Sequence, residues 1–171
     1  MIYLLDTNTV SYIVKGQSRH ARRKLERVSV DHDVCISVMT EAEIRFGLAR
    51  AKLSAATEAA VELFLSKIDI LAWDSAAARA YAKARATLER IGKLLANMDL
   101  LIAAHAAAVG AVLVTNDHTL EELLEAYRRE ADGQLGRRCG GETLTPHRLI
   151  VFAAKSLART AAFAVRVSSS S

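Results

Sequence analysis

Cysteine and proline are scarce in this chain of 171 residues, which contains two cysteines and one proline. Two cysteines cannot form a disulfide framework, and no CxxC pair or Cys/His cluster indicates a structural zinc site. A reducing, cytoplasmic setting is the simplest interpretation of so few cysteines. The first residues also lack the charged and then apolar pattern of a secretory signal, so we expect no leader peptide.

Uninterrupted apolar runs are missing as well. The longest apolar stretch, residues 149–167, is interrupted by Lys155, Arg159 and Arg166, so it is a poor membrane span and we expect no membrane partner. Hydrophobic residues make up 51% of the chain and charged residues 25%, as in soluble globular proteins. A chain of this length fits one domain and can bury a core without disulfide or metal staples.

Basic residues slightly outnumber acidic residues, and this excess is confined to the C-terminal part of the chain. The formal net charge of +4 comes from 23 basic and 19 acidic residues. Residues 1–127 contain 15 basic and 16 acidic side chains, whereas residues 128–171 contain 8 basic and 3 acidic side chains. Half of the eight glycines also fall in residues 133–141. We therefore predict a main domain at residues 1–127 and an atypical basic extension at residues 128–171, disordered or partly helical.

Short apolar runs alternate with helical patterns along the main domain. The apolar runs lie at residues 2–5, 34–37, 70–73 and 111–115, and the helical patterns at residues 19–27, 40–48 (capped by Thr40), 55–68, 75–91 (ending at Gly92) and 98–109 (ending at Gly110). Such alternation predicts an α/β fold in which helices cover both faces of a mainly parallel sheet. No closing strand is evident after the fourth apolar run.

Four acidic residues are expected to meet at one edge of this sheet. Asp6 and Asp117 follow the first and fourth strands. Asp99 lies in the first turn of the helix before the fourth strand, and Glu43 lies early in the helix after the second. Ligands bind at the carboxyl ends of parallel strands, and four carboxylates at close range repel one another unless a cation joins them. Oxygen ligands without cysteine or a histidine cluster favour Mg²⁺ or Mn²⁺, whose chemistry suits the hydrolysis of phosphate esters.

Each of these acids also has a purely structural interpretation. Asp6 and Asp117 are placed as helix N-caps, and Asp99 would complement a helix dipole. Glu43 taken alone is more simply ordinary surface. Asp74, the other acid at a strand end, precedes an alanine-rich helix and is a natural cap.

Four segments in this order carry a resemblance to a known family. They are residues 3–8 (YLLDTN), 36–47 (ISVMTEAEIRFG), 92–106 with Asp99 seven residues after Gly92, and 113–117 (LVTND). Together they resemble the PIN-domain family, and most closely its VapC-type toxins, over about residues 1–120. The resemblance implies a PIN-like three-layer α/β/α sandwich with a mainly parallel sheet of four to five strands. It also implies a Mg²⁺- or Mn²⁺-dependent endoribonuclease, the toxin of a type II toxin–antitoxin pair.

The family's acidic quartet corresponds by position to Asp6, Glu43, Asp99 and Asp117. The resemblance implies that Asp6 and Asp99 bind the metal directly and that Asp117 binds it directly or through water. Glu43, rather than the neighbouring Glu41, would complete the acidic site or orient the attacking water.

Polar residues near the quartet are expected to support it. Supporting or phosphate-contacting groups would be Thr7, Asn8, Ser37 and Thr115. We expect His105, on a small apolar helix, to face the packing, and His118 to be solvated.

The resemblance further implies a VapB-like antitoxin that covers the acidic site, an RNA substrate and a homodimer. We expect the antitoxin groove at apolar residues of the early helices, namely Val10, Tyr12, Ile13, Phe46 and Leu48. RNA needs positive charge near an acidic site, which five basic residues could supply unless they form only a solvated helix face. These are Arg19, Arg22, Arg23, Lys24 and Arg27.

The C-terminal part departs from the family, whose chains usually end soon after the fourth acid. Arg148, Lys155, Arg159 and Arg166 would share one face of a helix, which suits RNA or an anionic surface. The simpler alternative is an accidental extension from read-through or a shifted frame. A non-catalytic antitoxin-binding or RNA-binding module, crippled by this end, is therefore a second hypothesis. A phosphatase with an Asp nucleophile is disfavoured, since Asn8 stands where an Asp-x-Asp motif needs its second acid.

Overall fold

The computed structural model describes residues 1–16, 19–93, 96–118, 120, 122, 124, 125 and 151–153. A parallel sheet in the order β3-β2-β1-β4-β5 forms its middle layer. The strands are β1 (Ile2–Leu5), β2 (Asp33–Ser37), β3 (Asp69–Leu71), β4 (Val112–Thr115) and β5 (Val151–Ala153). The predicted α/β fold with a parallel sheet is confirmed.

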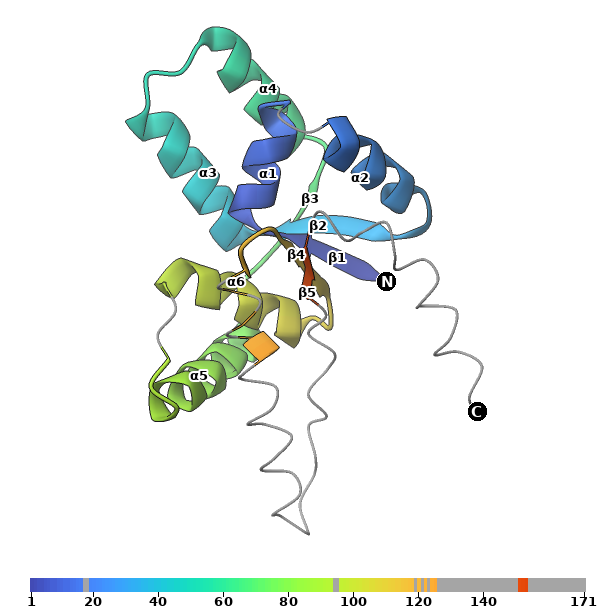
Figure 1. The fold of residues 1–171 in the computed structure, drawn as a ribbon. Helices are drawn as coiled ribbons and strands as arrows, with labels where there is room; N and C mark the ends of the chain where they lie inside the picture. Colours follow the sequence, from blue (N-terminus) through green and yellow to red (C-terminus); the bar gives the residue numbers. More distant parts are fainter. Residues whose placement is uncertain are drawn as a thin grey trace.

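Helices cover both faces of the sheet, as Figure 1 shows. On one side lie α1 (Thr7–Val14), α2 (Arg19–Asp31), α3 (Val38–Arg50) and α4 (Ala55–Leu65). The other side carries α5 (Ser75–Arg90) and α6 (Asn97–Ala108). This is the three-layer sandwich that the resemblance implies. Among the described residues, no helix is both long and apolar enough to cross a membrane.

The core follows from the pleat of the three central strands, because successive side chains of a strand point to opposite faces. One face of the sheet packs with α6, and its strands contribute Leu4, Cys35 and Leu113. The other face packs with α1 and α4, and its strands contribute Leu5, Ile36 and Val114. Both faces of the sheet are covered by helices, which explains why these strands are apolar runs in which polar residues do not alternate with apolar ones.

The start of α3 differs from the sequence-based expectation of a Thr40 cap. Ser37 is the N-cap, and its hydroxyl oxygen accepts the Met39 N–H at 3.0 Å. Thr40 lies inside the first turn, fully buried, where its hydroxyl contacts the Leu5 carbonyl at 3.5 Å. Ser37 ends β2 in an extended conformation, which is the backbone geometry that an N-cap needs.

Two glycines end helices as predicted. Gly92 follows α5 at a φ of 69°, and Gly110 follows α6 at a φ of 67°. Both values lie in the left-handed region, which glycine enters without the steric cost that a side chain brings. The turn at Gly110 sends the chain from α6 directly into β4, so the first turn of α6 lies toward the carboxyl end of that strand.

A closing strand exists that the sequence did not reveal. β5 pairs in parallel with β4, and Leu113, Val114 and Thr115 lie opposite residues 151, 152 and 153. A continuous basic helix over residues 148–166 is therefore wrong, since Val151–Ala153 is extended. The rest of the predicted extension lies outside the described residues, and the domain boundary near residue 128 stays a prediction.

Candidate active site

Asp6 is a buried carboxylate held by two neighbouring strands. It leaves β1 with its N–H bonded to the Val114 carbonyl of β4 at 3.1 Å. Its Oδ1 caps α1 by accepting the Thr9 N–H at 2.6 Å, and its Oδ2 accepts the Thr115 hydroxyl at 2.5 Å. The residue is 5% exposed. Burial raises the pKa of Asp6 even though these hydrogen bonds lower it.

Thr115 connects Asp6 to Asp117. The Thr115 side chain is completely buried at the end of β4, and its Oγ1 also accepts the Asp117 N–H at 3.0 Å. Asp117 in turn accepts the Leu120 N–H at 3.3 Å through Oδ1, as an N-cap would. One hydroxyl therefore fixes the loop after β4 against the carboxylate after β1.

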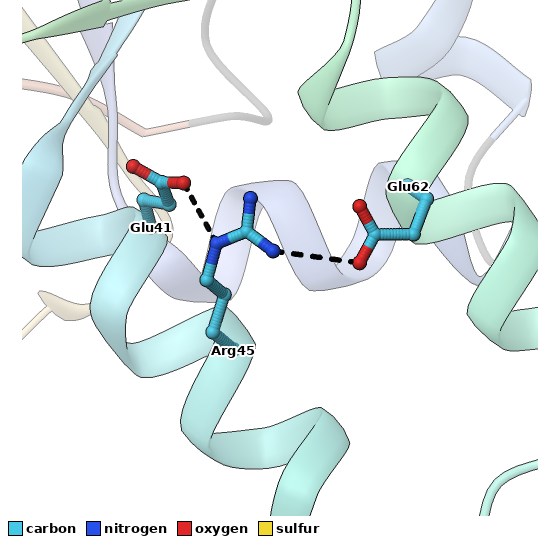
Figure 2. A network of polar contacts seen from close by, with 3 residues as sticks. All are labelled: Glu41, Arg45 and Glu62. Atoms are coloured by element: carbon cyan, nitrogen blue, oxygen red, sulfur yellow. Dashed lines mark hydrogen bonds and ion pairs between the residues drawn. The ribbon is translucent and has the colours of Figure 1, made fainter.

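Glu43 and Glu41 lie near each other on α3 but have different partners. Glu43 is half-buried and accepts a hydrogen bond from the Thr7 hydroxyl of α1. Glu41 accepts the Arg45 Nε–H at 2.7 Å, and Arg45 Nη1 lies 3.4 Å from Glu62 on α4, as Figure 2 shows. This exposed ion-pair network contributes little to stability. It leaves Glu43 as the glutamate that lies beside the residues following β1.

Asp99 interacts with the other three acids. It lies in the first turn of α6, which places it at the carboxyl edge of the sheet. Partial burial is the largest cause that raises the pKa of Asp99, followed by the negative charges of Glu43, Asp117 and Asp6. Three of the acids predicted from the sequence thus raise the pKa of the fourth, although the four come from different segments.

The donor set fits a hard divalent cation by chemistry and charge. All four side chains offer carboxylate oxygen, which Mg²⁺ and Mn²⁺ prefer, and a cation would relieve the repulsion around Asp99. Within the described ranges, no three acidic, imidazole or thiol groups lie close enough together to hold a metal ion. One oxygen each of Asp6 and Glu43 accepts a hydrogen bond from a threonine hydroxyl.

The supporting residues predicted from the sequence lie around these acids in different ways. Thr7 and Thr115 donate to Glu43 and Asp6, while Asn8 is exposed. Ser37 is completely buried, so it is not available to contact a phosphate and only a supporting role is left. Thr9 was missed by sequence reasoning: its N–H donates to Asp6, the N-cap of α1, and its hydroxyl donates to the Val114 carbonyl at 3.2 Å. The spacing of Asp6 and Thr9, which suits an N-cap and its N3 residue, was the available signal.

The residues expected at an antitoxin groove divide into core and surface. Val10 and Ile13 of α1 are buried in the core. Tyr12 and Phe46 are exposed, by 43% and 63%, and Leu48 is half-buried.

Of the predicted basic residues on α2, Arg23 and Arg27 are exposed. The side chains of the other three (Arg19, Arg22 and Lys24) lie outside the described part. His105 is buried and His118 exposed, as predicted.

Known proteins are similar to this chain in sequence and in fold. The PIN domain family model matches residues 3–125. The chain is 35% identical over 132 residues to Ribonuclease VapC2 of Haemophilus influenzae, covering 75% of this chain and 96% of that protein. It is 33% identical over 129 residues to the tRNA(fMet)-specific endonuclease VapC of Shigella flexneri, with the same coverage. The crystal structure of VapBC2 from Rickettsia felis, bound to a DNA fragment from their promoter, superposes with a TM-score of 0.66 at 30% identity. This match covers 75% of this chain and 92% of that one.

Proposed function

The chain belongs to the PIN-domain family, among its VapC-type ribonucleases, and on that premise we propose that it is a Mg²⁺- or Mn²⁺-dependent endoribonuclease and the toxin of a toxin–antitoxin pair. The observation that supports this most is the electrostatic interaction of Asp99 with Glu43, Asp117 and Asp6 at the carboxyl edge of the sheet. Interacting carboxylates of this kind are typical of a site that binds a cation.

Each acidic residue of the site would have its own role in RNA cleavage. Asp6 and Asp99 would hold the ion, and Asp117 would bind it directly or through water. When bound, the ion neutralises charge on the phosphodiester and makes a water molecule more acidic. Glu43, held by the Thr7 hydroxyl, orients the attacking water and accepts its proton. Thr115 keeps Asp6 in place by donating to Oδ2.

The purified chain should cleave RNA when Mg²⁺ or Mn²⁺ is present and lose this activity in EDTA. Initiator tRNA is a suitable substrate, because the Shigella relative is named for it. Asp6→Asn, which keeps an N-cap acceptor but removes the charge, should lower the cleavage rate at least about a hundredfold. Glu41→Gln is the matched control, and since Glu41 is paired with Arg45 its rate should stay unchanged.

Two results would count against this proposal. Cleavage that persists in EDTA would exclude a metal-dependent site. Full activity of Asp6→Asn would exclude a role of the acidic residues in cleavage. Partner binding without cleavage or growth arrest would favour the alternative, a non-catalytic antitoxin-binding or RNA-binding module.

An antitoxin would bind this chain over α1, α3 and α4. Similar solved structures are VapBC complexes, including that from Salmonella typhimurium. Large apolar side chains are exposed on these helices at Tyr12, Phe46 and Leu63, the last by 56%. An ion pair between Arg45 of α3 and Glu62 of α4 connects these two helices (Figure 2). Exposed apolar groups rimmed by charge are typical of a protein-binding surface.

Phe46→Glu should therefore weaken binding of a VapB-like antitoxin by at least about tenfold, measured by calorimetry. Val30→Glu on α2 is the control, because Val30 is 78% exposed and lies outside this surface. Equal effects of the two changes would contradict the assignment. If the surface instead joins two copies, the isolated chain would sediment as a dimer and Phe46→Glu as a monomer.

A further inference from the structure

His105 is a buried imidazole that the proposed mechanism does not use. It lies in the last turn of α6 and is 1% exposed. Its ring meets Trp73 edge-on, with the ring centroids 5.6 Å apart. Its Nδ1 lies 2.8 Å from the Ser37 hydroxyl oxygen. A buried polar ring is costly unless its nitrogens are hydrogen-bonded, so these partners define its protonation state.

The surroundings select one neutral form of the ring. His105 also hydrogen-bonds the backbone of Ala72, a contact that raises its pKa as an accepting carbonyl does. Burial is the largest effect and lowers the pKa of His105 although the charge of Asp74 also raises it, so the ring is neutral and has a single N–H. A carbonyl cannot donate, so that N–H faces Ala72 and Nδ1 accepts the Ser37 proton. The Ser37 oxygen remains free to accept the Met39 N–H at the start of α3.

This ring therefore joins three segments that carry or border the acidic residues. Ser37 lies at the junction of β2 and α3, six residues before Glu43. His105 lies six residues after Asp99 on α6. Ala72 follows β3 directly. The hydrogen bond between Ser37 and His105 thus links the start of α3, the helix of Glu43, to α6, the helix of Asp99.

We propose that His105 and Ser37 form a positioning pair that sets the distance between Glu43 on α3 and Asp99 on α6. His105 touches neither RNA nor metal; it acts through the helix positions. The inference rests on the proposed function, because the distance matters for activity only if these acids bind a cation. A hydrogen bond between the two helices that carry metal-binding groups should tune metal affinity as much as fold stability.

Substitutions of His105 that each retain the hydrogen bond of only one ring nitrogen test the positioning pair. His105→Asn places an acceptor where Nδ1 lies and keeps the bond to Ser37. His105→Gln places an N–H where the second ring nitrogen lies and keeps only the bond to Ala72. His105→Leu removes both bonds. Ser37→Ala removes the pair but also the cap of α3, so Ser54→Ala, which removes the cap of α4, is its matched control.

Two readouts separate positioning from general destabilisation. We expect the Mn²⁺ dissociation constant, measured by calorimetry, to rise about tenfold in His105→Leu, His105→Gln and Ser37→Ala. In the same variants kcat should fall about ten- to a hundredfold while KM for RNA changes less than about twofold. His105→Asn should restore most of both values, and Ser54→Ala should match the wild type.

The outcomes distinguish this inference from the function on which it rests. If His105→Asn is as impaired as His105→Leu, or if the variants lose only thermal stability, the positioning pair is refuted while the nuclease stands. If the wild type binds no Mn²⁺, the proposed function fails and the inference fails with it.

Discussion

Asp99→Asn is expected to lower RNA cleavage at least about a thousandfold and, in EDTA, to melt at a higher temperature than the wild type. The loss of activity follows because an amide carries no charge to hold a cation or balance it. The gain in stability follows because burial and the charges of Glu43, Asp117 and Asp6 all disfavour the ionised Asp99 in the folded state. Removing such repulsion typically gives about 1 kcal/mol, or about 2–4 °C in a chain of this size.

The effect of pH on this gain has a defined sign. The folded state raises the pKa of Asp99 above its ordinary value of 3.8. The carboxyl group therefore contributes most to stability below that ordinary value, and the contribution is lost as the pH rises through the raised value. The melting difference between Asp99→Asn and the wild type should be full near neutral pH and disappear in acid. Scanning calorimetry in EDTA measures it.

The exposed Asp33 supplies the control for Asp99. Asp33→Asn should change neither cleavage nor the melting temperature appreciably. With saturating Mn²⁺ the order should reverse, because the wild type then gains binding free energy that Asp99→Asn cannot. An Asp99→Asn protein that melts below the wild type in EDTA would contradict the electrostatic description of the site.

Leu113→Ala should destabilise the fold by about 3 kcal/mol, lowering the melting temperature by about 6–12 °C. Leu113 is fully buried in β4, where it lies opposite Leu4 of β1 and residue 151 of β5. Its side chain belongs to the core shared with Ile102 and Ala106 of α6. Strands on both sides hold the backbone in place, so the cavity cannot collapse and the lost contacts are not replaced.

Leu63→Ala on α4 deletes the same atoms from a side chain that is 56% exposed, and it should change stability by less than about 0.5 kcal/mol. Urea unfolding of the two variants gives the comparison. Similar losses in both would show that β4 is not the centre of the core.

The central strands were predictable because their sequences are locally unambiguous. The runs at β1, β2 and β4 are largely apolar on both faces, as is typical of parallel strands covered by helices on both sides. Gly92 and Gly110 end their helices for a purely local reason, their positive φ. The N-cap of α3 was assigned to the wrong residue because both Ser37 and Thr40 suit a cap, and only the extended end of β2 selects Ser37.

Long-range pairings could not be read from the sequence. β5 has no periodic signal of its own, and it is defined by the open edge of β4 far along the chain. Ser37 and His105 are 68 residues apart, so their hydrogen bond becomes visible only when the helices are placed. The four acids were found through spacing and resemblance, and the structure adds their electrostatic interaction. Their metal coordination stays a prediction.

The strand order has a consequence for the newly made protein. β1 is synthesised first but lies at the centre of the sheet, between β2 and β4. Asp6 is therefore made well before its partners Thr115 and Asp117, and Asp117 is added 111 residues later. At typical rates of translation this takes on the order of ten seconds. Until β4 has joined β1, a chain emerging from the ribosome has no complete group of acids, so the four acids come together only after residue 117 has been made.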